Sequence, residues 1–207
     1  MSRAGMLIGL GVAAALALAN FAAAQDDQDA AAWSRQAARG AFELCRVDAP
    51  DAGKVAEQGE VWGWPEFVPY LEHPVGYERT AGGESRRTLT VGDQTSYVEL
   101  TVQSGEVKSA APAQVRYFRC EVAANQPVNQ TLAAYFTARY GRPSVVTGRS
   151  TVWLAGATPV AGAAASDDAA LAPVIAGPVG AKVTRVELSH ERGLDRAKLS
   201  FFEKTAG

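Results

Sequence analysis

Apolar and polar residues alternate along several segments of this chain, and this period of two constrains the fold more than any other feature of the sequence. In the segment 95–102, Val98, Leu100 and Val102 alternate with more polar neighbours, and the segment 113–123 repeats the pattern. Alternation of this kind is typical of strands that bury one face. It predicts strands over residues 88–91, 95–102, 113–123, 145–154, 183–189 and 197–202.

These predicted strands follow one another in runs instead of alternating with helices. A Gly-Asp pair at 92–93 separates the first two, and a turn that contains Gly193 separates the last two. Runs of strands joined by short turns favour antiparallel pairing, with helices gathered on one face of the sheet. The sequence therefore predicts an α+β fold with a mostly antiparallel sheet. A length of 207 residues is typical of a single domain.

The longest helical pattern precedes the first strand. Residues 33–47 place Ala38, Ala41, Phe42 and Cys45 at spacings of i, i+3, i+4 and i+7, which puts them on one helix face. Three of these four side chains are small. We therefore expect the helix backbone to lie close against the sheet.

Two shorter helices complete the predicted elements. Residues 50–57 predict a second helix that Gly59 ends, so that the first two helices form an N-terminal helical cap. One further helix is predicted after the third strand, with Asn125 or Asn129 as its N-cap, and is expected to pack on one face of the sheet. Residues 155–181, rich in Ala, Gly and Pro, predict a long loop that holds one short helix starting at Ser166.

The N-terminus has the composition of a secretory signal peptide. Arg3 precedes an uncharged run over residues 6–19, and three alanines follow at 22–24. The competing interpretation is a membrane anchor, which needs about 20 apolar residues. We expect cleavage after Ala24, so that residues 1–24 are a signal peptide, residues 25–207 form the exported domain, and no transmembrane segment remains. The predicted location is the periplasm or the medium.

Export changes the interpretation of the two cysteines, Cys45 and Cys120. In an oxidising compartment a lone pair of this kind most often forms a disulfide. The alternatives are two separate buried thiols and, more remotely, a catalytic cysteine. The sequence favours the disulfide.

Composition excludes several classes of function. The chain has 20 basic and 22 acidic residues, so it lacks the basic excess that nucleic-acid binding calls for. Two His and two Cys argue against a zinc site or an iron–sulfur cluster, and we expect neither a metal nor a cofactor. The motifs of phosphate loops, dinucleotide sites, serine hydrolases and zinc proteases do not occur.

The candidate binding residues lie in one aromatic segment, residues 61–70. Trp64, Phe67 and Tyr70 are the predicted binding residues, because clustered rings form platforms for sugars, peptides or lipid tails. The alternative is that these rings fill the core. We expect Trp62 to fold back into the core and Trp64 to be partly exposed.

Two hypotheses of function follow. The first is a non-catalytic periplasmic binding or interaction module whose partner is a small molecule or an envelope protein. The second is a small periplasmic hydrolase that uses His190 or His73 as a general base beside neighbouring carboxylates. For each histidine, the sequence favours an ordinary solvated position over a catalytic one.

Overall fold

The computed structural model describes the chain in six stretches: residues 27–46, 51–69, 77–91, 93–110, 112–156 and 166–206. The predicted signal peptide, Tyr70 and His73 lie outside the described residues. Within these stretches, no helix is long and apolar enough to cross a membrane.

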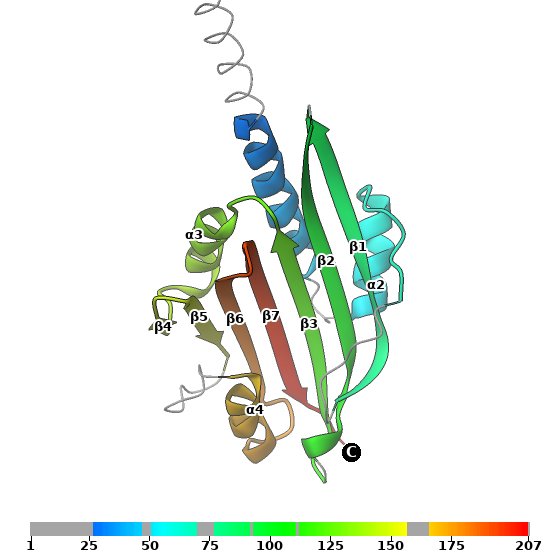
Figure 1. The fold of residues 1–207 in the computed structure, drawn as a ribbon. Coiled ribbons are helices and arrows are strands. Elements are labelled where there is room, and N and C mark those ends of the chain that lie inside the picture. Colours follow the sequence, from blue (N-terminus) through cyan, green and yellow to red (C-terminus); the bar gives the residue numbers. More distant parts are fainter. Residues whose placement is uncertain are drawn as a thin grey trace, which may run out of the picture.

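An antiparallel sheet forms the centre of the molecule (Figure 1). Its strand order is β1-β2-β3-β7-β6-β5-β4, and every neighbouring pair runs antiparallel. The strands are β1 (Tyr77–Val91), β2 (Gln94–Val107), β3 (Val115–Ala124), β4 (Val145–Val146), β5 (Ser150–Ala155), β6 (Lys182–Glu191) and β7 (Leu194–Lys204). The predicted α+β class and antiparallel sheet are confirmed, although β1 begins well before the predicted residue 88.

Three helices cover one face of the sheet, which we call the α face. They are the N-terminal helix, which is helical over residues 27–44, α2 (Ala52–Val61) and α3 (Asn129–Tyr140). In Figure 1 the N-terminal helix (blue) and α2 (cyan) lie behind the sheet. The predicted helical cap and the further helix therefore share one face, as the sequence indicated.

The main core lies between these helices and the sheet. The predicted stripe of the N-terminal helix, from Ala38 to Cys45, is buried against alternate residues of β2 and β3, such as Leu100 and Phe118. Cys45 forms a disulfide with Cys120, with 6.3 Å between the two Cα atoms. The predicted bridge is confirmed, and it ties the end of the N-terminal helix to the middle of the sheet.

The opposite face of the sheet, here called the polar face, carries charged side chains on its central strands, among them Arg119, Glu121, Arg185 and Glu187. A fourth helix, α4 (Asp167–Ala176), covers its lower end in the view of Figure 1. Ser166 is its N-cap, and the Ser166 hydroxyl accepts a hydrogen bond from the Ala169 N–H at 3.1 Å. The predicted start of this helix is confirmed. Residues 166–181 are not loose, however, because Leu171 and Val174 are buried in a second core with Val183 and Phe202.

A residue distant in the sequence caps α3. The Asp195 carboxylate, at the start of β7, accepts hydrogen bonds from the N–H groups of Val128 at 2.7 Å and Asn129 at 2.8 Å. The predicted caps are wrong: Asn125 accepts from the Tyr97 N–H instead, and the Asn129 side chain donates to the carbonyl oxygen of Ser189. Free N–H groups at a helix start need an acceptor, but the acceptor need not be local.

Candidate functional site

The end of α2 decides where the aromatic segment goes. The Trp64 N–H donates to the Gly59 carbonyl at 3.0 Å and the Gly63 N–H donates to that of Glu60 at 3.0 Å. Gly63 has a φ of 80°, so this is a Schellman motif with glycine in the left-handed position. Such a motif reverses the direction of the chain, so the side chain that follows it is turned back toward the helix.

The expected exposures of the two tryptophans are consequently reversed. Trp64 is only 4% exposed and belongs to the main core, whereas Trp62 is 49% exposed. Trp62 is the last residue before the reversal and its ring stays outside. The prediction failed because Gly59 does not end α2: the helix continues to Val61, and Gly63 provides the left-handed residue that ends it.

A hollow lies over the ring of Trp64. It has a volume of about 260 Å³ and separates the N-terminal helix from the end of α2. Its lining combines three indole rings, an amide, a guanidinium and two small helical residues: Trp33, Gln36, Ala37, Gly40, Trp62, Trp64 and Arg87. We call this site the tryptophan hollow.

The tryptophan hollow has an apolar floor and a positively charged wall. The guanidinium of Arg87, on β1, lies over the Trp64 ring at 5.5 Å from its centroid. A cation over an indole face is attracted by the ring's negative quadrupole, which holds Arg87 in place. Trp33 and Arg87 are partly exposed and Gln36 is exposed, so their polar groups reach the solvent side of the hollow.

Gly40 leaves one side of the tryptophan hollow open. A side chain added at this helical position meets no atom within 4 Å of its Cβ. Glycine in the middle of a helix lowers stability by roughly 0.5–1 kcal/mol relative to alanine. The helix therefore lacks a side chain at Gly40 although the surrounding structure leaves room for one.

Phe67 and Tyr70, the other predicted binding residues, do not add to the described lining of the tryptophan hollow. Phe67 does not line the tryptophan hollow; it fills the space between α2 and β1, where a methyl group on Gly59 would lie 2.8 Å from the Phe67 ring. Tyr70 lies outside the described residues. Of the predicted binding residues, Trp64 therefore lines the tryptophan hollow and Phe67 packs against the core.

Sequence reasoning missed most of this site, although a signal was present. Trp33, Gln36, Ala37 and Gly40 follow the spacing i, i+3, i+4 and i+7, and so form a second stripe beside the core-facing one. Nothing in the sequence linked this stripe to Arg87, because their proximity depends on how the N-terminal helix is placed relative to β1.

His190 contacts Asp195, and neither Glu187 nor Glu191, the acidic neighbours that the sequence suggested, is its partner among the described ion pairs. Its Nδ1 atom lies 2.7 Å from Oδ1 of Asp195, and its side chain is 65% exposed. The other oxygen of Asp195 caps α3, as described above. His190 lies at the end of β6 in the β6–β7 hairpin, whose turn has positive φ at Arg192 and Gly193. His73 lies outside the described residues.

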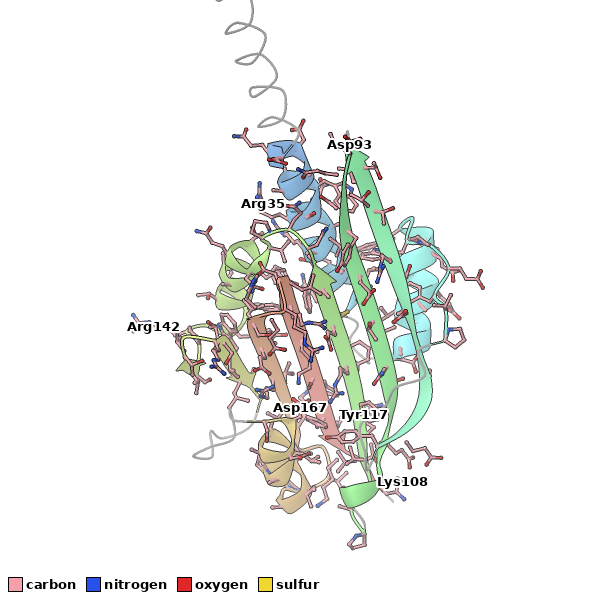
Figure 2. All side chains as sticks on the ribbon, viewed as in Figure 1. Arg35, Asp93, Lys108, Tyr117, Arg142 and Asp167 are labelled. Carbon is pink, nitrogen blue, oxygen red and sulfur yellow. A yellow bond between two sulfur atoms is a disulfide. The ribbon has the colours of Figure 1, made fainter. Side chains whose placement is uncertain are left out.

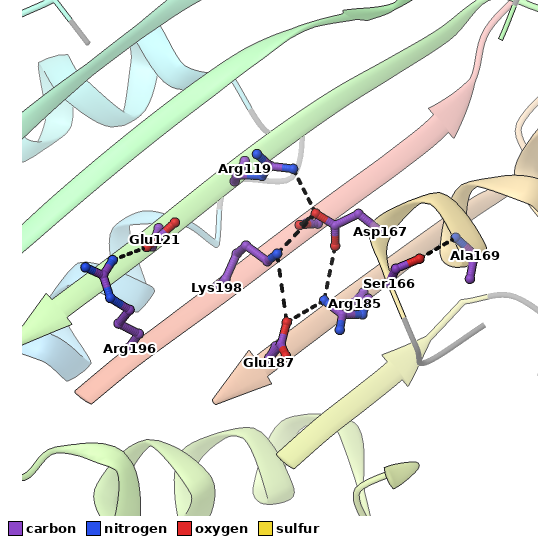
Figure 3. A network of polar contacts seen from close by, with 10 residues as sticks. Arg119, Glu121, Ser166, Asp167, Ala169, Arg185, Glu187, Arg196 and Lys198 are labelled. Atoms are coloured by element: carbon purple, nitrogen blue, oxygen red, sulfur yellow. Dashed lines mark hydrogen bonds and ion pairs between the residues drawn. The ribbon is translucent and has the colours of Figure 1, made fainter. Parts of the chain in front are cut away.

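A network of charges occupies the polar face where α4 meets the sheet (Figure 3). Asp167, the first residue of α4, contacts Arg119 at 2.8 Å, Arg185 at 3.2 Å and Lys198 at 3.4 Å. Glu187 lies 2.8 Å from the same Arg185, which is only 2% exposed. Figure 2 places Asp167 at the lower end of the sheet, where three neighbouring strands supply the cations.

The network favours the ionised form of Asp167. Burial by itself raises the pKa of this carboxyl group, but the charges of Lys198, Arg119 and Arg185 and a hydrogen bond from Ser200 bring the pKa below its usual range. A hollow of about 330 Å³ lies beside the network. Its charged walls include the ion pair of Arg196 with Glu121 at 2.8 Å, so much of its charge is already neutralised.

Two further observations bear on the chemistry of the chain. Among the described residues, no group of three or more His, Cys, Asp or Glu side chains is placed to hold a metal ion. Comparison of the chain with protein-family models, with curated proteins and with solved structures gives no match.

Proposed function

We propose that this protein is an exported, non-catalytic module that binds a sugar ring in the tryptophan hollow. The observation that carries the proposal is the open space over Trp64, bounded by the rings of Trp33 and Trp62 and by the guanidinium of Arg87. Export is supported by the N-terminal composition and by the disulfide, which is typical of oxidising compartments.

The chemistry of the tryptophan hollow matches the two kinds of surface that a sugar presents. Indole rings offer flat apolar faces for the C–H face of a pyranose ring. The Arg87 guanidinium and the Gln36 amide supply N–H donors for hydroxyl or carboxylate oxygens. A volume of about 260 Å³ is at the small end for ligand sites, which suits one ring of a longer saccharide.

The bare backbone at Gly40 also supports a binding role. Alanine there would favour the helix and would meet no neighbour, so glycine costs stability without a packing reason. A ligand that passes close to the helix supplies such a reason. We therefore infer that the saccharide crosses the N-terminal helix at Gly40.

The binding test is a titration followed by tryptophan fluorescence. The probes are cellotriose, maltotriose and the trimer of N-acetylglucosamine, and we expect at least one to give a saturable change in the wild-type protein. Trp62→Ala removes one wall of the hollow, and Gly40→Leu fills it; each should weaken binding about tenfold or more, as loss of a stacking contact does at binding hot spots.

Two variants serve as matched controls. Val61→Ala truncates the exposed neighbour of Trp62 and should bind like the wild type. Gly40→Ala adds a single carbon at the same position and should weaken binding less than Gly40→Leu does. The proposal fails if none of the three saccharides gives a saturable change, or if Gly40→Leu binds as tightly as Gly40→Ala.

A second candidate, the small hydrolase, is supported by the 2.7 Å contact between His190 and Asp195. A carboxylate that orients an exposed imidazole is the arrangement of a general base. A screen of ester, amide and glycoside substrates with wild type and His190→Gln tests it. Hydrolysis that His190→Gln abolishes would replace the first proposal.

A further inference from the structure

A second hollow, on the α face, is lined by positive charge, although the chain as a whole has a net charge of −2. Its volume is about 280 Å³, and we call it the basic pocket. Four cations line it, Arg46, Arg116, Arg139 and Lys182, against the single carboxylate of Glu203. The lining thus has an excess of three positive charges.

The sheet fixes one row of these charges. Arg116 on β3 and Lys182 on β6 are both direct neighbours of Glu203 on β7, so the three side chains form a cation–anion–cation row across adjacent strands. Arg116 is held by Glu203, with its Nε atom 2.8 Å from Oε2. Glu203 therefore neutralises Arg116 first and leaves the charge of Lys182 largely uncompensated.

Helix ends supply the other two cations. Arg46 follows the N-terminal helix directly after Cys45, so the disulfide fixes its backbone over β3. Its guanidinium contacts Glu43 at 2.6 Å. Arg139 lies in the last turn of α3 and packs over the ring of Tyr140, with its carbon Cζ 5.5 Å from the ring centroid.

Two of the four cations are left without an acidic partner in the described part of the chain. No carboxylate there lies within 4 Å of the side-chain nitrogens of Arg139 or Lys182, although both point at the same hollow. Like charges brought together repel, so a purely structural arrangement would be expected to pair or separate them. A bound anion removes this repulsion.

We propose that the basic pocket binds a small organic molecule with two or more carboxylate or phosphate oxygens. Guanidinium groups match such oxygens with paired N–H donors, and Lys182 adds a point charge. The rings of Tyr140 and Phe201 in the wall provide an apolar surface for the carbon part of the molecule. This site lies apart from the tryptophan hollow and does not depend on the function proposed there.

The test uses citrate and inorganic phosphate as probes, with sodium chloride at equal ionic strength as the reference. Isothermal titration and the rise in melting temperature report binding, because a ligand that binds the folded state stabilises it. We expect saturable binding of at least one probe, weaker at higher salt because the attraction is screened. Binding of only citrate, or of only phosphate, would identify which oxyanion the pocket accepts.

The double variant Arg139→Gln with Lys182→Gln removes the two unpaired cations, and both are exposed, so the fold should persist. It should bind at least tenfold more weakly, the size expected when charged hydrogen bonds are lost. Arg149→Gln, with Arg142→Gln, is the matched control: it removes the same charge from exposed positions that do not line the pocket.

The proposal is overturned if neither probe binds, or if the double variant and its control lose affinity equally, since that would indicate general surface attraction. It is also overturned if the protein ignores both soluble probes but sediments with phosphatidylglycerol vesicles. Trp62→Ala should bind the anion normally, so a failure of the saccharide proposal leaves this result unaffected.

Discussion

Trp64 and Trp62 are two positions apart but have opposite environments. Trp64 lies under Arg87 in the main core, whereas Trp62 stands at the rim of the tryptophan hollow. The difference comes from one residue, Gly63, whose positive φ reverses the chain between them. At the scale of single residues, a backbone conformation open to glycine thus selects which ring is structural and which can meet a ligand.

We predict that Trp64→Ala lowers the free energy of unfolding by about 3–5 kcal/mol, the usual cost of truncating a buried aromatic residue. Trp62→Ala should cost well under half as much, because half of its surface already faces water. Denaturant titration of both variants measures the difference. Equal losses would mean that Trp62 is packed in solution.

Asp167 is the residue on which α4 depends. Its carboxylate forms ion pairs with three cations and accepts a hydrogen bond from the Ser200 hydroxyl. The residue also lies at the positive end of the helix dipole. Without it, the buried guanidinium of Arg185 would lose a carboxylate contact, although the contact with Glu187 would remain. An uncompensated buried charge is costly, so this carboxylate stabilises the second core as well as the helix.

We predict that Asp167→Asn lowers stability by about 3 kcal/mol at pH 7. The pKa of Asp167 is lowered in the folded protein, so its contribution is present above the unfolded value of about 3.9 and is lost as the pH falls through the folded value. The gap between wild type and variant should therefore close below about pH 4. Asp168→Asn, at the exposed neighbour, should change stability little at any pH.

At the scale of elements, the same substitution of glycine by alanine should have opposite effects at two positions. Gly40 lies inside the N-terminal helix with open space around it, whereas Gly63 ends α2 with a φ of 80°. Alanine favours a helix interior but pays a steric cost in the left-handed region.

We predict that Gly40→Ala stabilises the protein by about 0.5–1 kcal/mol and that Gly63→Ala destabilises it by about 1–2 kcal/mol. Neither added methyl group meets a neighbour, so both effects come from the backbone. Thermal or denaturant unfolding measures them. A stabilising Gly63→Ala would show that α2 does not end in the described motif.

At the scale of the whole molecule, the disulfide joins the helical cap to the sheet. It spans 75 residues, from the end of the N-terminal helix to the centre of β3. It also holds the backbone beside Arg46, and through it one wall of the basic pocket. We therefore expect removal of the bridge to loosen the N-terminal helix and the wall of the basic pocket that Arg46 provides.

We predict that Cys45→Ala with Cys120→Ala lowers the free energy of unfolding by roughly 4 kcal/mol, the value that chain entropy gives for a loop of this length. Hydrogen exchange should rise most in the N-terminal helix, while β6 and β7 keep their protection. An unchanged melting temperature would contradict the energetic role of the bridge.

Features that depend on near neighbours were predictable from the sequence. Alternation located the strands, the helical stripe located the buried face of the N-terminal helix, and Ser166 marked the start of α4. The disulfide was predicted from the export signal and from the presence of a single pair of cysteines. For the strands, the helix face and the cap, the information lay within a few residues of the feature, because periodicity and capping are local.

Tertiary structure alone decided the sites. Asp195 caps α3 from about 66 residues away, Asp167 contacts cations from three strands, and Arg87 on β1 lies over the ring of Trp64. The tryptophan hollow and the basic pocket likewise join elements that are remote in the chain. Such contacts depend on the order of the strands and the placement of the helices, which result from packing the whole core; a local pattern can show one wall of a site, as the second stripe of the N-terminal helix does, but not what lies opposite it.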